Sequence, residues 1–232
     1  MKRSKITILL AIVLGMTFHS CLDLEPQDQL GGKNMWTSVN DYKQFANTFY
    51  SWTRDFSSVV YDGTHSDKRS DLITYQSYNE FSRGINSIPS SDANYTDNYK
   101  HIRRTNLLLQ NAEAYAKPED IKQYIGEAYF FRAYSYFDLL QLYGDVIITK
   151  KPLDITDPEM KVKRNDRSEV VDLIIDDLNH AVENLPAFKE LTTEEEGRIS
   201  KEGAQAFLSR VALYEGTWQK SRNGNQNTQR SA

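Results

Sequence analysis

The distribution of hydrophobic positions is helical along most of the chain. Apolar residues recur every three or four positions, which places them on one face of an α-helix. This spacing predicts five helices: one carrying Tyr42, Phe45, Ala46, Phe49 and Phe56, one over about 94–116, one over about 119–143, one from Val170 to Leu185, and one that follows Ser200 and extends to Trp218. No segment alternates in the manner of a strand. The predicted fold class is all-α.

Polar residues mark where several of these helices begin and end. Ser38 followed by Asp41 is a capping-box pattern at the start of the first helix. Pro118 separates the second helix from the third. Asp166 can cap the start of the fourth helix, and Pro186 marks its end. These signals support the helix boundaries that the spacing predicts.

Three helices differ in which faces they are expected to bury. In the second, one stripe carries Tyr95, Tyr99, Ile102, Asn106 and Leu109. The third is apolar on most faces from residue 128 onward, which predicts a buried central helix. In the fourth, acidic residues accompany the apolar stripe and are interpreted as a solvated surface: Asp172, Asp176 and Asp177.

A faint internal repeat relates the third helix to the fifth. Residues 127–137 resemble residues 205–215, with Arg132 matching Arg210. Each copy follows another predicted helix, so the repeating unit is a helical hairpin, as in tetratricopeptide-type arrays. The strict period of about 34 residues is absent, so the array is irregular. Chance similarity between two aromatic-rich amphipathic helices is the alternative.

The N-terminus has the pattern of an export signal. Three cations lie within the first five residues, and residues 6–18 are uncharged and mainly aliphatic. That run is shorter than the roughly 20 apolar residues of a spanning helix. Ser20-Cys21 then favours a lipoprotein signal, although Phe18 and His19 depart from the usual lipobox. Lipid attachment gives the single cysteine a role, and the alternative is a secreted protein with an unused thiol.

These features divide the chain into three parts. Residues 1–20 form the predicted lipoprotein signal peptide, 21–34 a flexible polar tether, and 35–232 a helical domain. Within that domain, residues 57–93 form a long loop region that carries several aromatic residues. Loops of this length are usually functional or disordered. Residues 221–232 have no apolar anchor and resemble a chain cut inside a connection.

Charge and motif content exclude several classes of function. Removal of residues 1–20 takes away Lys2, Arg3 and Lys5, so the formal charge moves from −4 to −7. This negative net charge disfavours binding to nucleic acid and electrostatic attachment to an anionic lipid surface. The chain has no nucleotide-binding glycine loop, no dinucleotide fingerprint and no nucleophile elbow. Its histidines never pair at a spacing of four, so no metal site and no cofactor are predicted.

Aromatic residues are the remaining signal, with 14 Tyr, 10 Phe and 3 Trp in 232 residues. Most of them belong to helix faces and are expected to pack in the core. Those in the long loop are different, because tyrosine combines a flat apolar face with a polar tip and can stack on a sugar ring. Tyr75, Tyr78 and Phe81 are therefore candidate ligand contacts, and packing is the alternative role for each.

Several motifs together resemble one family of proteins. Residues 127–146 contain Glu-Ala, Arg-Ala-Tyr, Tyr-Phe and Leu-Tyr-Gly-Asp-Val, followed by Pro152. This run closely resembles the signature helix and exit turn of the SusD/RagB-type surface lipoproteins of Bacteroidetes. Residues 200–218 resemble the next helix of that family. The acidic stretch Leu-Asp-Leu-Glu-Pro-Gln-Asp after Cys21 also resembles the surface-export signal of such lipoproteins.

The resemblance implies a fold, a location and a role. The fold would be an irregular tetratricopeptide-like array of helical hairpins with long loops. The protein would be palmitate-anchored at the outer membrane and exposed at the cell surface. It would capture glycan or another nutrient without catalysis and pass it to a TonB-dependent, SusC-like transporter. Family members are considerably longer, so residues 35–232 would correspond to their N-terminal part, incomplete at the C-terminus.

The sequence is also compatible with two other functions. A lipid-anchored helical-repeat adaptor would bind a protein partner on the concave face of its array. A surface glycan hydrolase would need a pair of carboxyl groups, and the 32 acidic residues give no reason to select two.

Overall fold

The computed structural model describes residues 35–54, 83–85, 87–153 and 156–230, and these ranges are mainly helical, with no strand among them. The α-helices are α2 (Val39–Asn47), α3 (Ala93–Ala112), α4 (Lys122–Tyr143), α5 (Arg167–Asn184) and α6 (Lys201–Arg230). Single 3₁₀ turns are η1 (Thr48–Trp52), η4 (Pro118–Ile121), η5 (Pro158–Lys161), η6 (Phe188–Glu190) and η7 (Thr193–Glu195). The all-α prediction is confirmed. None of the helices described here has an apolar run long enough to cross a bilayer.

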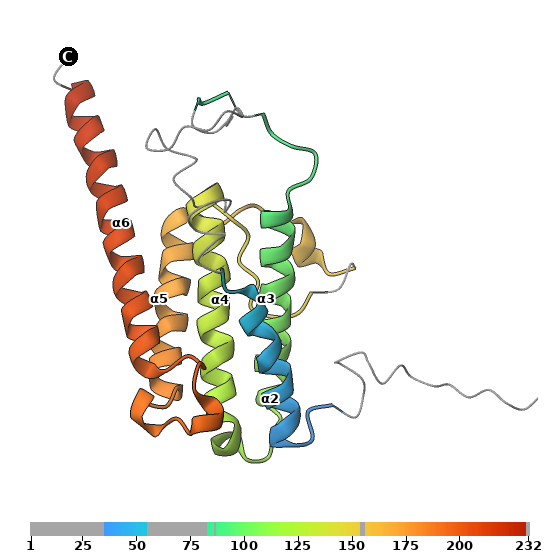
Figure 1. Ribbon diagram of the computed structural model, residues 1–232. Helices are drawn as coiled ribbons and strands as arrows, with labels where there is room; N and C mark the ends of the chain where they lie inside the picture. The colour runs from blue at the N-terminus through green and yellow to red at the C-terminus, as the bar shows by residue number, and fades with distance from the viewer. Residues whose placement is uncertain (1–34, 55–82, 86, 154–155, 231–232) are drawn as a thin grey trace, which may run out of the picture. The chain divides into compact units, whose positions relative to one another are not determined.

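The helices form antiparallel hairpins in chain order. Figure 1 shows α3, α4, α5 and α6 side by side, each antiparallel to the next, with α2 packed against α3 and α4. The pairs α3–α4 and α5–α6 are therefore two hairpins, as the repeat predicted. This arrangement lets each amphipathic helix bury its apolar face against a neighbour.

The predicted helix boundaries have clear local causes. At the start of α2, the backbone N–H of Ser38 donates to Asp41 Oδ2 at 2.8 Å, and the N–H of Asp41 donates to Ser38 Oγ at 3.3 Å. The carboxylate of Glu169 accepts from the N–H that precedes α5. Helix α4 ends at Tyr143 and is followed by Gly144, whose φ of 69° lies in the left-handed region that glycine tolerates.

Helix α4 is the buried central helix. Phe131, Tyr136, Leu139 and Leu140 on this helix are each at most 1% exposed. The helix contacts α3 on one side and α5 on the other. Its buried side chains therefore cover most of its circumference, as the apolar pattern predicted.

An ion pair fastens the connection before α6 to this central helix. Arg198 donates from Nε and Nη2 to the two oxygens of Glu127 at 2.7 and 2.6 Å, and Glu127 is fully buried. Burial raises the pKa of Glu127, and the hydrogen bonds from Arg198 oppose that rise. Arg198 also donates to the side chain of Asn47 at the end of α2. One guanidinium thus links three parts of the chain.

The prediction of a solvated acidic face on α5 is wrong for Asp177. Asp172 and Asp176 are exposed, whereas Asp177 is fully buried and forms an ion pair with Arg132 of α4. Asp177 lies seven residues after Val170, which is close to two helical turns, so it shares the apolar face. Helical spacing alone therefore places it in the interior.

Helix α6 buries its predicted inner face and runs further than expected. Ala204 and Val211 are buried, and Phe207 contacts Phe130 and Phe137 of α4. The sequence predicted a connection over 221–232, but the helix continues to its last residue at position 230. Polar residues and glycine weaken a helix without blocking its hydrogen bonds, and no proline interrupts this segment.

Candidate functional site

The residues with predicted functional roles lie outside the described part of the chain. They are the acylation candidate and the loop aromatics: Cys21, Tyr75, Tyr78 and Phe81. The domain boundaries at residues 20 and 34 lie outside it as well, so all of these stay predictions. The described residues contain a different feature, an open cavity between α3 and the segment that follows α4.

One wall of this cavity is the non-helical segment 146–153, called the wall segment below. Alternate residues of it line the cavity: Ile147, Thr149, Lys151 and Leu153. This alternation is the period of an extended chain. Asn165 pairs with its beginning, since its backbone N–H donates to the Val146 carbonyl at 2.9 Å and its Oδ1 accepts from the Ile148 N–H at 2.9 Å. The rest of the segment is held by side chains of the helices.

Two tyrosine hydroxyls take the place of a neighbouring strand. Tyr99 of α3 donates to the Ile147 carbonyl and accepts from the Ile147 N–H, both at 2.9 Å. Tyr136 of α4 accepts from the Thr149 N–H at 2.8 Å and donates to the Thr149 carbonyl at 3.2 Å. Burial raises the pKa of both phenols, so both stay protonated and can donate. Each hydroxyl satisfies two backbone groups of the wall segment.

A buried polar network holds the far end of the wall segment. Asn106 of α3 donates from Nδ2 to the carbonyls of Thr149 and Lys151 at 2.9 and 3.3 Å. Its Oδ1 accepts from Arg132 Nη1 at 2.8 Å. Arg132 also donates to both oxygens of Asp177, at 2.8 and 2.6 Å. The network therefore joins α3, α4, α5 and the wall segment.

The charge of Arg132 is stabilised within this network. Burial opposes the charged guanidinium, but the hydrogen bonds and ion pair with Asp177 outweigh it and raise the pKa of Arg132. All three side chains are almost fully buried, with Asn106 at 1%, Arg132 at 6% and Asp177 at 0% exposure. A buried network whose groups are all paired fixes one arrangement of its parts. The network therefore holds the wall of the cavity in position, and it places no unpaired charge inside the cavity.

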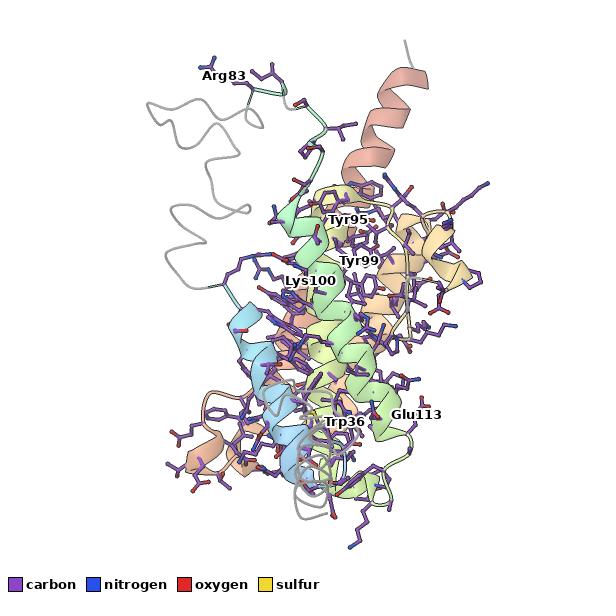
Figure 2. The ribbon with its side chains drawn as sticks, turned by 90° about the vertical axis from the view of Figure 1, so that its right-hand side faces the viewer. Trp36, Arg83, Tyr95, Tyr99, Lys100 and Glu113 are labelled. Atoms are coloured by element: carbon purple, nitrogen blue, oxygen red, sulfur yellow. The ribbon has the colours of Figure 1, made fainter. Side chains whose placement is uncertain are left out.

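The cavity has a volume of about 480 Å³ and is lined by both aromatic and cationic side chains. From α3 come Tyr95, Tyr99, Lys100 and Arg103, together with Thr96. Figure 2 shows Tyr95, Tyr99 and Lys100 along α3. The rings of Tyr95 and Tyr99 lie 4.8 Å apart, and Tyr95 meets Tyr143 edge-on at 5.2 Å. The cavity therefore offers aromatic surface on a rigid helix.

Polar groups surround this aromatic surface. Lys100 forms an ion pair with Asp97 at 2.8 Å, and Arg103 donates from Nε to the Leu153 carbonyl at 3.3 Å. These contacts hold the two cations at the rim. A concave apolar surface with a few placed polar groups is typical of a small-molecule site, and rings with hydroxyl donors suit a sugar. The arrangement is suited to binding.

Sequence reasoning missed this site because it placed Tyr95 and Tyr99 on a packing stripe. Both are half-buried, whereas Ile102 on the same stripe is fully buried. A usable signal was the position of the two tyrosines at the first turns of α3, before the fully buried part of the stripe. The partner surface, 146–153, is distant in sequence and could not be assigned to them.

Among the residues that the structure describes, no group of three or more His, Cys, Asp and Glu side chains is placed to hold a metal ion. His101 stacks on Trp52 with ring centroids 4.1 Å apart, and His180 stacks on Tyr129 at 4.9 Å. Both imidazoles are thus engaged with aromatic rings.

Comparison with known proteins shows one consistent likeness. A SusD-like family model described as "Starch-binding associating with outer membrane" matches residues 22–213. SusD-like protein P38 of Formosa agariphila is 28% identical over 233 aligned positions, which cover 92% of this chain and 42% of that protein. The chain thus spans less than half the length of this relative.

Solved structures agree with the family match. A SusD-like protein from Bacteroides fragilis is 25% identical, with a TM-score of 0.63 over 84% of this chain and 38% of that one. A laminarin-binding SusD-like protein is 31% identical, with a TM-score of 0.53 over 60% of this chain and 30% of that one. The helical arrangement described above is therefore shared with these proteins.

Proposed function

This chain belongs to the SusD-like family, as the motif at 127–146 predicted, and from that membership we propose that it is a surface lipoprotein that binds carbohydrate. It takes up glycan or a related nutrient without catalysis and passes it to a TonB-dependent transporter of the outer membrane. The family description names starch binding and association with the outer membrane, and one related structure is of a laminarin-binding protein.

The cavity beside α3 is the observation that carries the proposal. Tyr95 and Tyr99 supply ring surface, and Lys100, Arg103 and Thr96 supply donors and acceptors for sugar hydroxyls. Aromatic stacking combined with hydrogen bonding gives affinity and orientation together. The predicted loop contacts Tyr75, Tyr78 and Phe81 precede α3 in the chain and are proposed to add to the same ligand surface.

The buried carboxylates of the described residues support a binding role without catalysis. They are Glu127, Asp177 and Glu215, and each forms an ion pair with an arginine. A glycosidase needs one carboxyl group that can donate a proton and a second facing it across the substrate. A carboxylate held by a guanidinium at under 3 Å is poorly suited to either task.

Lipid attachment at Cys21 would keep this binding surface at the membrane. Residues 21–34 are polar and would act as a tether, which leaves the helical domain free to meet a membrane-embedded partner. A receptor of this kind needs a transporter, because a bound glycan still has to cross the outer membrane. The proposed partner is a SusC-like barrel.

Affinity electrophoresis against a panel of polysaccharides, starting with starch and laminarin, tests the ligand class. We expect retardation by at least one glycan and a dissociation constant raised about tenfold by Tyr95→Ala, which corresponds to about 1.4 kcal/mol of lost stacking. Phe188→Ala is the matched control, since Phe188 is 65% exposed on η6 and does not line the cavity. Failure of every glycan to retard the chain would reject carbohydrate as the ligand.

Membrane attachment is tested separately in a Bacteroidetes host. Wild-type protein should fractionate with the outer membrane and incorporate labelled palmitate, whereas Cys21→Ser should do neither. Copurification of the wild type with a TonB-dependent barrel tests the partner. If Cys21→Ser remained acylated and membrane-bound, the anchor would lie elsewhere.

A further inference from the structure

A second cavity lies near the other end of α3. It has a volume of about 340 Å³, and its lining includes Gln110 of α3, Glu113 directly after α3, Tyr129 of α4, His180 of α5, and Lys151 of the wall segment. Neither the family match nor the relatives assign it a role. Its lining is more polar than that of the cavity at Tyr95, which is called the first cavity below.

Aromatic surface is present in the second cavity too. The ring of His180 stacks on Tyr129 with an interplanar angle of 28°, and the His180 side chain is still 44% exposed. Arg132 lies 5.3 Å from the centroid of the Tyr129 ring. The stack is therefore fixed from inside the protein and accessible from outside. Gln110 and Glu113 are exposed and place hydrogen-bonding groups beside it.

Both cavities lie on one face of α3. Tyr95, Tyr99 and Arg103 line the first cavity, and Gln110 and Glu113 line the second. At 3.6 residues per turn these five positions fall within about a quarter of the helix circumference, and the whole α3 lining of the two cavities covers about half of it. Figure 2 shows Tyr95 and Glu113 towards opposite ends of α3. At 1.5 Å per residue, the backbone between them spans roughly 27 Å.

Lys151 connects the two cavities because it lines both of them. Its carbonyl accepts from Asn106, which lies between Arg103 and Gln110 on the same face of α3. The Arg132 network thus fixes the point where the cavities adjoin. A ligand that fills the first cavity would extend past Lys151 to reach the His180 stack.

We propose that the two cavities form one elongated binding track along α3, with the ring surfaces of Tyr95 and His180 near its ends, and that the track takes an extended oligosaccharide. The proposal rests on carbohydrate binding as proposed above and specifies chain length as the property recognised. One cavity holds a short fragment. Both are occupied only by a fragment of several sugar units.

Calorimetric titration of the full chain with size-fractionated fragments, from a disaccharide upward, tests the track. The fragments are cut from the polysaccharide that retards the wild type most strongly. We expect the wild-type dissociation constant to fall with fragment length by about tenfold or more, and to level off once the second cavity is filled. His180→Ala should weaken binding of long fragments about tenfold and leave the disaccharide unchanged, whereas Tyr95→Ala should weaken both.

Gln110→Ala is a second variant with the same expected length dependence, and Asn179→Ala, at the exposed neighbour of His180, is the matched control. Equal thermal midpoints would show that the variants are folded. If affinity does not depend on length, or if His180→Ala and Gln110→Ala leave long fragments unaffected, the track is rejected while carbohydrate binding stands. If no polysaccharide or fragment binds the wild type, the proposed function fails first.

Discussion

The hydroxyl of Tyr99 hydrogen-bonds to both backbone groups of Ile147, with the carbonyl and the N–H each 2.9 Å away. The Tyr99 side chain therefore satisfies both backbone hydrogen-bonding groups of Ile147, as a neighbouring strand would in a sheet. The consequence is that the wall of the candidate site depends on the helices beside it. Changes in α3 or α4 that never touch a ligand should still alter the cavity.

Tyr99→Phe tests this dependence. The substitution keeps the ring and removes the hydroxyl, so the N–H and carbonyl of Ile147 lose their partner. Leaving such groups unsatisfied costs about 1–3 kcal/mol when they are buried, and Ile147 is only half-buried, so we expect a loss of about 1–2 kcal/mol. Hydrogen exchange at the Ile147 amide should become faster, and by a larger factor than the change in global unfolding alone would produce.

Tyr115→Phe is the control, because it removes a hydroxyl from a half-buried tyrosine that follows α3 and does not line the cavity. It should leave exchange at Ile147 unchanged. Unaltered exchange in Tyr99→Phe as well would mean that the wall segment is held by its other contacts.

Arg132→Met should be among the most destabilising changes in the described chain. It leaves Asp177 buried without its partner and removes the donor to Asn106, and breaking one side of a buried pair costs about 3–5 kcal/mol. Adding Asp177→Leu to the same chain should recover much of that loss, because the unpaired carboxylate is gone. Urea unfolding of the single and double variants measures both effects.

The internal repeat provides the control for this prediction. Arg210 of α6 matches Arg132 in the repeat but is exposed, so Arg210→Met should change the free energy of unfolding by no more than about 0.5 kcal/mol. A comparable loss from both arginines would show that removal of a cation, rather than burial of the Arg132 pair, destabilises the fold.

His101 should make stability depend on pH in the weakly acidic range. Burial, against Trp52 among other neighbours, lowers the pKa of this imidazole from 6.5 to about 4, and Asp97 and Asp138 only partly oppose that shift. Between these values the unfolded chain binds a proton that the folded chain does not. The free energy of unfolding should therefore fall as pH drops from about 6.5 towards 4.

Because His101 is partly exposed, solvent screening reduces this contribution to about 1 kcal/mol. The measurement compares urea unfolding of the wild type and His101→Gln at pH 7 and pH 5. The wild type should lose more stability over that interval than the variant. Parallel losses would assign the acid sensitivity to other groups.

Helical spacing predicted most of the fold and little of the site. The apolar period located α3 to α6 and identified α4 as the buried helix, because burial of one face is what the period encodes. The site depends on contacts between residues far apart in sequence. Tyr99 and Ile147 are 48 positions apart, and Arg132 and Asp177 are 45 apart. No local pattern relates such pairs.

The burial of Asp177 could have been predicted from the helical spacing of α5. It shares a face with Val170, Ile174 and Ala181, so an acid at that position requires a cationic partner in the interior. Arg132, within the apolar run of the predicted central helix, was the matching cation. Pairing Arg132 with Asp177 requires the packing of α4 against α5, which the sequence alone does not specify.

The contact between α4 and α5 gives the sharpest test of close packing. A Cβ atom added to Gly126 of α4 would lie 2.9 Å from Leu185 Cγ and 3.1 Å from Asn184 Cβ, at the end of α5. Gly126→Ala should therefore destabilise the chain by about 1–3 kcal/mol through overpacking, although alanine favours the helix by about 1 kcal/mol. Gly216→Ala is the matched control, since Gly216 is an exposed α6 residue whose added Cβ would meet nothing within 4 Å. It should leave stability unchanged or raise it by up to about 1 kcal/mol in thermal unfolding. Stabilisation by both substitutions would mean that α4 and α5 can separate at this point without cost, and that the close approach at Gly126 is not needed by the fold.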